Sequence, residues 1–134
     1  MELIDLGLLV LRVVLGLSVA AHGAQKLFGW FGGYGIAGTG GWLESIGVKP
    51  GKLAAFLAGF GEFFGGLLLV AGLFTTFAGV AVALVLIVAI ATAHKGKGFW
   101  NTNGGSELPV LIIASAIALA LTGAGEFSVD ALIS

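Results

Sequence analysis

The chain has 134 residues, of which 58% are hydrophobic and 10% are charged, with a net charge of −1. About a quarter of the residues of a soluble domain are charged, so this chain has too few charges to cover a water-facing surface. The net charge gives no sign of the basic face that nucleic-acid binding needs. The absence of cysteine excludes disulfides, thiol relays and thiolate metal sites. One membrane domain over residues 1–134 is therefore predicted.

Four apolar segments are predicted to form membrane-spanning helices, at residues 6–28, 53–73, 74–94 and 107–123. A helix needs roughly 17–25 residues to cross about 30 Å of hydrocarbon. The fourth segment is short, so it must include flanking residues or lie where the bilayer is thin. Glu2 and Asp5 stand where a secretory signal would be basic, so we expect the first segment to remain as a span.

The longest connection, residues 29–51, is rich in glycine and aromatic residues. Its aromatic side chains suit the lipid headgroup region, where Trp and Tyr concentrate; they are Trp30, Phe31, Tyr34 and Trp42. Within this connection, residues 39–46 are expected to form a short interfacial helix.

The second and third spans are joined by a tight turn. Gly72 suits the position just after a helix, and Thr75 or Thr76 is expected to cap the next helix. Such a short connection makes the two helices antiparallel neighbours. The predicted fold is thus all-α, an antiparallel bundle of four transmembrane helices. Small residues at close-packing spacing, including Gly16 with Ala20 and Gly79 with Ala83, favour close helix contacts in lipid.

Basic residues predict the orientation. They lie in or beside the first and third connections: Lys26, Lys49, Lys52, Lys95 and Lys97. The ends of the chain carry only acids: Glu2, Asp5, Glu126 and Asp130. By the positive-inside rule, both connections are expected in the cytoplasm and both termini outside.

Six ionisable residues lie within the predicted spans or at their edges: Arg12, His22, Lys26, Glu62, His94 and Glu107. A charge at the centre of the bilayer costs at least about 2.5–3.5 kcal/mol, so such groups normally face the bundle interior and pair. Arg12 and Glu62 are expected at similar depth on antiparallel helices, and an ion pair between them is predicted. That pair either takes part in function or only fixes the register of the helices.

The other groups are expected near the cytoplasmic end, and each has a structural alternative. Lys26 can extend to the headgroups, His94 can mark an interfacial helix end, and Glu107 can stabilise a helix N-terminus. His22 is the strongest functional candidate, because the adjacent Gly23 leaves room for a ligand.

Two histidines on separate spans also raise the question of haem. Both lie near one membrane edge and nothing else marks a haem pocket, which argues against it. No tight spacing of metal ligands occurs, so no metal site is predicted.

Several motifs together resemble the DoxX family, over almost the whole chain. They are Arg12, the segment His22-Gly23-Ala24-Gln25-Lys26-Leu27-Phe28-Gly29, Glu62 among glycines, Gly98-Phe99-Trp100 through to Glu107, and Leu121-Thr122-Gly123-Ala124-Gly125. The resemblance implies a four-helix bundle in the cytoplasmic (inner) membrane of a bacterium or archaeon. The family is labelled as oxidoreductase-related, and the related DoxD subunit belongs to a thiosulfate:quinone oxidoreductase. Without cysteine, electron transfer here would need a bound quinone, a cofactor or a partner chain.

The sequence therefore predicts a quinone-linked redox component that works with membrane or peripheral redox proteins or as a homo-oligomer. His22 and Glu62 are the catalytic candidates, and the candidate cofactor-binding residues are Arg12, His22, Lys26, Glu62 and Glu107. A non-catalytic accessory subunit of a membrane complex is the alternative. A small transporter is a weaker alternative, because the chain has no clear internal repeat.

Overall fold

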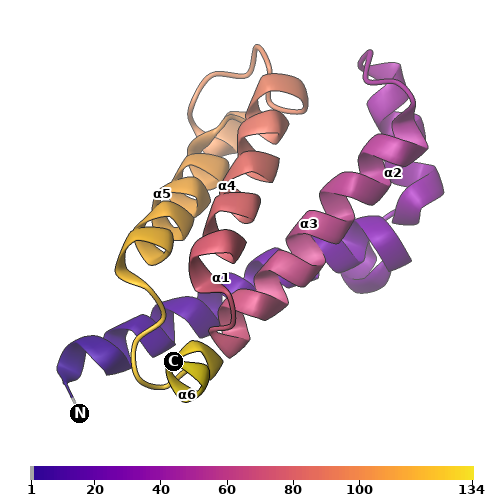
Figure 1. Ribbon diagram of the computed structural model, residues 1–134. Helices are drawn as coiled ribbons and strands as arrows, with labels where there is room; N and C mark the ends of the chain where they lie inside the picture. The colour runs from indigo at the N-terminus through magenta and orange to yellow at the C-terminus, as the bar shows by residue number, and fades with distance from the viewer. Residues whose placement is uncertain (1) are drawn as a thin grey trace.

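The computed structural model describes residues 2–134, and these form helices and connecting turns without any strand (Figure 1). The four main helices are α1 (Leu3–Phe28), α3 (Gly51–Ala71), α4 (Thr75–Thr92) and α5 (Glu107–Thr122). Four shorter elements connect or follow them: η1 (Trp30–Gly32), α2 (Gly35–Ser45), η2 (Asn101–Asn103) and α6 (Val129–Ile133). The main helices begin and end within three residues of the predicted segments. The predicted interfacial helix lies within α2 apart from its final residue, Ile46.

Three helices are long and apolar enough to cross a membrane, namely α1, α3 and α4. Only 33% of the most apolar 18-residue window of each is buried inside the protein. The remaining apolar surface suits lipid rather than water. Helix α5 has 16 residues, and at about 1.5 Å per residue it reaches about 24 Å, which is less than the thickness of the hydrocarbon core. The fold thus presents three candidate spans and one shorter apolar helix.

Helix α1 packs along α3, and α4 packs along α5. In Figure 1 these two pairs diverge from the short α3–α4 turn, so that the other ends of α3 and α4 lie well apart. The α1–α3 contact depends on glycines, because a Cβ atom added at Gly16 would lie 2.5 Å from the carbonyl oxygen of Gly66. A Cβ atom added at Gly79 would lie 2.5 Å from the carbonyl oxygen of Ala116 on α5. The predicted use of Gly16 and Gly79 in close helix contacts is confirmed.

A hydrophobic core joins the two helix pairs. Its buried members come from α1, α3, α4 and α5: Leu15, Val19, Leu69, Ala78, Val82, Ala83, Leu86, Ile112, Ala116 and Leu119. The core residues lie in the middle of α1, in the last turn of α3 and in the middle and last turns of α5. The core therefore lies beside the α3–α4 turn rather than at the diverging ends.

The α3–α4 turn is held by the C-terminal segment of the chain. Gly72 ends α3 with a φ of 68°, as predicted for a residue after a helix. The predicted threonine cap of α4 is wrong. The Asp130 carboxylate takes that role and accepts hydrogen bonds from the backbone N–H groups of Phe74 (2.7 Å) and Thr75 (3.0 Å). The backbone N–H of Asp130 in turn donates to the carbonyl of Gly72 at 2.8 Å.

The molecule therefore has two different ends. We call the α3–α4 turn with the first turns of α1 and residues 124–134 the closed end. The connections 29–50 and 93–106, with the helix turns beside them, form the open end. Both chain termini belong to the closed end, where Asp5 accepts a hydrogen bond from the backbone N–H of Glu126 at 3.1 Å. The lysine-bearing connections belong to the open end, where Lys26 and Lys97 line a common cavity.

Candidate functional site

Arg12 belongs to the closed end and does not contact Glu62. Its side chain is 1% exposed and makes five hydrogen bonds, all to backbone carbonyl oxygens. The acceptors lie in the last turn of α3 and in the C-terminal segment: Leu69, Val70, Ala124 and Phe127. A guanidinium has five N–H donors, so this side chain has no donor left for a ligand. The predicted Arg12–Glu62 ion pair is wrong.

The axial register of α1 against α3 explains this result. Gly16 meets Gly66 and Val70 of α3, and Gly23 meets Gly59 and Phe63. Glu62 is thus level with His22 in the C-terminal third of α1, roughly 12–18 Å along the helix from Arg12. Arg12 is level instead with the end of α3, where the final carbonyls of the helix lack partners within the helix.

Asp130 is a second charged group at the closed end. Burial alone would raise the pKa of Asp130, but the hydrogen bonds from Thr75 and Phe74 and the nearby charge of Arg12 together lower it below its ordinary value. The carboxylate form is therefore the form that the folded closed end favours.

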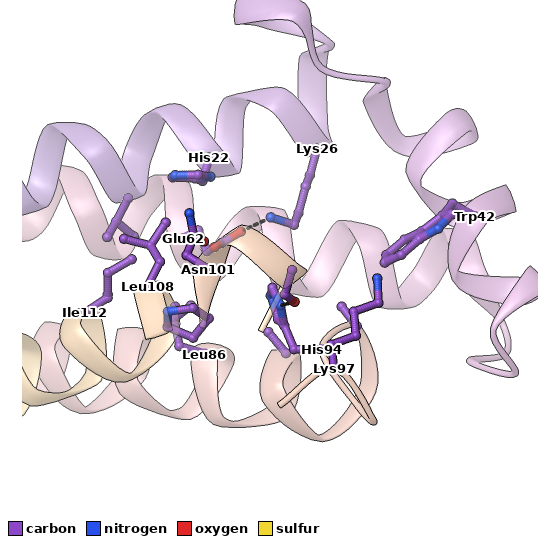
Figure 2. Close-up of a pocket in the computed structure, with 15 residues that line it drawn as sticks. His22, Lys26, Trp42, Glu62, Leu86, His94, Lys97, Asn101, Leu108 and Ile112 are labelled. Atoms are coloured by element: carbon purple, nitrogen blue, oxygen red, sulfur yellow. Dashed lines mark hydrogen bonds and ion pairs between the residues drawn. The ribbon is translucent and has the colours of Figure 1, made fainter. Parts of the chain in front are cut away.

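A cavity of about 390 Å³ lies at the open end between the two helix pairs, and we call it the inter-pair pocket (Figure 2). Its lining comes from all four main helices, from α2 and from the connection after α4: Val19, His22, Lys26, Trp42, Glu62, Leu86, Ala89, Ala93, His94, Lys97, Asn101, Gly104, Leu108, Pro109 and Ile112. Most of these side chains are apolar, and the polar ones converge from different elements. Concave, largely apolar sites with a few convergent polar groups are typical of small-molecule binding sites.

An ion pair between Lys26 of α1 and Glu62 of α3 lies on the wall of this pocket. Lys26 Nζ lies 2.6 Å from Glu62 Oε1, and the side chains are 30% and 6% exposed. Figure 2 shows this contact with Leu108 and Ile112 on one side and Trp42 and Lys97 on the other. Lys26 therefore turns toward α3 instead of extending to the headgroups. Within residues 2–134, the other carboxylate oxygen of Glu62 accepts no hydrogen bond, so the pair retains capacity for a ligand.

Both histidines line the inter-pair pocket. His94 Nδ1 lies 2.8 Å from the carbonyl oxygen of Gly104, so a neutral His94 donates from Nδ1 and leaves Nε2 as an acceptor. His22 lies above the Glu62 side chain in Figure 2, and its ring makes no hydrogen bond with the part of the chain that the structure describes. Across Glu2–Ser134, no three His, Cys, Asp or Glu side chains gather as a metal site would require.

Glu107 lies outside the pocket. It is the first residue of α5, and its side chain accepts a hydrogen bond from the backbone N–H of Asn101 at 2.9 Å. Of the predicted site residues, the structure thus brings together His22, Lys26 and Glu62. It separates Arg12 and Glu107 from them.

Four polar or aromatic lining residues are absent from the predicted site, namely Trp42, His94, Lys97 and Asn101. The sequence pattern indicates the headgroup region for Trp42, an interfacial helix end for His94, and only the orientation of the chain for Lys97. The shared position of both lysine-bearing connections at one membrane edge was the available signal for Lys97. No feature of the sequence marks Asn101, because only the fold of the connection after α4 places it over the pocket.

Comparison with known proteins identifies the family. The family model of DoxX matches residues 7–95 of the chain. A protein of Bacillus subtilis (strain 168) named "Putative oxidoreductase CatD" is 35% identical over 126 residues, which cover 94% of this chain and 86% of that protein. No solved structure matches the chain. The matched region contains the inter-pair pocket residues of α1, α2, α3 and α4, and the chain belongs to the DoxX family.

Proposed function

We propose that this DoxX protein is a four-span component of the cytoplasmic membrane that binds a quinone head group in the inter-pair pocket and works with a partner redox protein. The observation that carries the proposal is the Lys26–Glu62 pair, which lies at 2.6 Å on the wall of a mostly apolar cavity. The lysine count supports placing the open end in the cytoplasm. The oxidoreductase name of the Bacillus subtilis relative supports the redox assignment.

The chemistry of a quinone matches the groups that converge on the pocket. Quinone carbonyl oxygens accept hydrogen bonds, and the Lys26 ammonium is a donor beside them. Reduction of a quinone to a quinol takes up two electrons and two protons. Imidazole side chains can donate or accept protons, so His22 and His94 on the pocket wall are suited to supply or receive these protons.

The electrons must come from outside the chain. The sequence contains no cysteine, and its side chains offer no other two-electron donor. A partner oxidoreductase is therefore part of the proposal, with the quinol as the product that leaves. Glu62 would hold Lys26 in position and relay a proton between the pair and the ligand.

A binding measurement tests the proposal directly. The protein is placed in lipid nanodiscs with Trp30 and Trp100 replaced by Phe, so that Trp42 is the fluorescent reporter on the pocket wall. Added decylubiquinone is expected to quench this fluorescence in a saturable way. The Glu62→Gln variant is expected to bind at least about tenfold more weakly, because a hydrogen bond that involves a charged group contributes roughly 1.5–3 kcal/mol.

Glu126→Gln is the matched control, since Glu126 is exposed at the closed end and far from the pocket. It is expected to leave binding unchanged. Absence of saturable quenching in the parent protein, or equal binding by the Glu62→Gln variant, would contradict the proposal.

A second candidate function is that of a non-catalytic accessory subunit. The 16-residue length of α5 favours it, because a helix that is short for the bilayer gains from a neighbour that shields its ends. Small residues on exposed helix faces would also suit a neighbouring chain, but Gly16, Gly23 and Gly66 are used in contacts within this chain. Native mass spectrometry from membranes tests it: a stable partner chain with no quinone bound would favour this role.

A further inference from the structure

Two further cavities continue from the inter-pair pocket toward the outer surface of the protein. A linking cavity of about 120 Å³ shares five lining residues with the inter-pair pocket: Lys26, Trp42, Glu62, Ala89 and Ala93. A groove of about 350 Å³ shares four lining residues with the linking cavity: Ala54, Ala58, Val85 and Val88. The three spaces thus meet in series, and the Lys26–Glu62 pair stands where the first two join.

The groove runs between α3 and α4, and we call it the α3–α4 groove. Its lining is entirely apolar and consists of the four residues shared with the linking cavity together with Leu57 and Leu84. Leu57 and Leu84 are each 57% exposed, and Val88 is 61% exposed, so the groove opens on the outer surface of two candidate spans. That surface faces hydrocarbon when the protein is in a membrane.

The divergence of α3 and α4 explains why a groove forms here. The two helices are fixed together at the tight turn around Gly72 and separate toward the open end (Figure 1). Small side chains at Ala54 and Ala58 leave the space between them unfilled. On the other side of α3, glycines instead allow the backbone of α1 to approach closely.

From this continuity we propose that the inter-pair pocket takes an amphipathic, lipid-soluble ligand whose hydrocarbon tail lies in the α3–α4 groove. The inference rests on the proposed function and adds the class of ligand and its route: the ligand enters sideways from the bilayer between α3 and α4. The polar head contacts Lys26 and Glu62, the linking cavity holds the first part of the chain, and the rest of the tail lies against apolar side chains. A water-soluble ring without a tail would fill the pocket and leave the groove to lipid.

Ala58 is the position for the test, because it lines both the linking cavity and the groove but not the inter-pair pocket. The Trp42 fluorescence assay is repeated with decylubiquinone and with the tail-less ubiquinone head group. Tail burial gains little over lipid, since both surroundings are apolar. The expected effect is steric: Ala58→Phe lowers the affinity for decylubiquinone by about tenfold relative to the tail-less quinone, because the phenyl ring fills space that the tail would occupy.

The ratio of the two affinities is the measured quantity, because partition of each quinone into lipid is the same for every variant. Leu67→Phe is the matched control, since Leu67 is an exposed residue of the same helix outside all three spaces, and it should leave the ratio unchanged. Val88→Phe repeats the test at the exposed rim without adding a second fluorescent tryptophan, and no core contact is disturbed there. Binding of the tail-less quinone verifies that each variant is folded.

The outcomes separate the two proposals. If neither quinone binds the parent protein, both the proposed function and the inference fail. If both bind and neither Ala58→Phe nor Val88→Phe changes the ratio, the quinone site stands and the lateral route is overturned. Loss of a co-purified phospholipid from Ala58→Phe at an unchanged ratio would also overturn it, because the groove would then hold an acyl chain.

Discussion

The closed end and the open end each place a charged side chain inside the protein, but the two charges are satisfied in different ways. At the closed end, Arg12 gives all five donors to backbone carbonyls, and the residue is 1% exposed. At the open end, Glu62 pairs with Lys26 through one carboxylate oxygen and borders a cavity of about 390 Å³. An ionisable residue in a membrane helix is often taken as functional. Under the proposed function, the hydrogen-bonding capacity that such a residue retains is a better guide to its role than its charge alone.

The largest effect is expected from Arg12→Met, which tests whether the closed end is structural. The change leaves several buried carbonyls without a donor, and each such loss costs about 1–3 kcal/mol. We expect the free energy of unfolding to fall by at least about 3 kcal/mol. Thermal unfolding in detergent measures this loss, and quinone binding by the folded fraction should stay unchanged. If Arg12→Met had normal stability but no longer bound quinone, Arg12 rather than the Lys26–Glu62 pair would be the functional charged group.

A smaller effect is expected from Gly23→Ala, which tests the packing that fixes the register of α1 and α3. The added methyl group would collide with the backbone of Phe63 and Gly59. Overpacking of this kind costs typically about 1–3 kcal/mol in unfolding free energy. Gly7→Ala in the same helix is the control, because no atom lies within 4 Å of a Cβ added there. It should be neutral or slightly stabilising, since alanine favours helix more than glycine. Equal effects at both positions would show that the seam is loosely packed.

Asp130→Asn tests how the C-terminal segment holds the α3–α4 turn, and its effect should depend on pH. The lowered pKa of Asp130 means that its charged form stabilises the folded state. This contribution is complete above the unfolded pKa of about 3.9 and is lost as the pH falls through the lower folded pKa. Loss of a helix cap costs about 1 kcal/mol. The difference in unfolding temperature between the parent and Asp130→Asn should therefore be steady at neutral pH and shrink below about pH 4. A difference that persists unchanged at pH 3 would rule out the carboxylate as its source.

The smallest effect on stability is expected from the open end itself. A double-mutant cycle with Lys26→Met and Glu62→Gln should give a coupling in unfolding free energy below about 1 kcal/mol, because Lys26 is 30% exposed to its surroundings. The same variants should lose quinone binding. A coupling of several kcal/mol with unchanged binding would make this pair structural like Arg12, and the distinction between the two ends would disappear.

Much of the fold could be predicted because it depends on local features of the chain. Apolar segment length set the four main helices to within three residues, and Gly72 marked the end of α3. The position of His22, Lys26 and His94 near one edge followed from where each lies in its span, and all three line the same pocket. The low content of charged residues is by itself enough to predict that lipid surrounds most of the helical surface.

The pairing of charges could not be predicted in this way. The apolar pattern of two antiparallel helices is compatible with many axial registers. Two registers that differ by eight residues place a side chain about 12 Å apart along the helix. The close approach of the two helices at Gly16 and Gly23 fixes the register, and this register places Glu62 beside Lys26 rather than beside Arg12. Asp130 and Asn101 show the same limit, because each reaches its position through a turn whose path depends on the rest of the protein. The sequence by itself indicated that lipid surrounds the helices, where the helices lie along the chain, and at which end of the bundle the polar groups gather. The tertiary structure decided which charge is fully bonded and which borders a cavity, because that depends on register and on helix divergence.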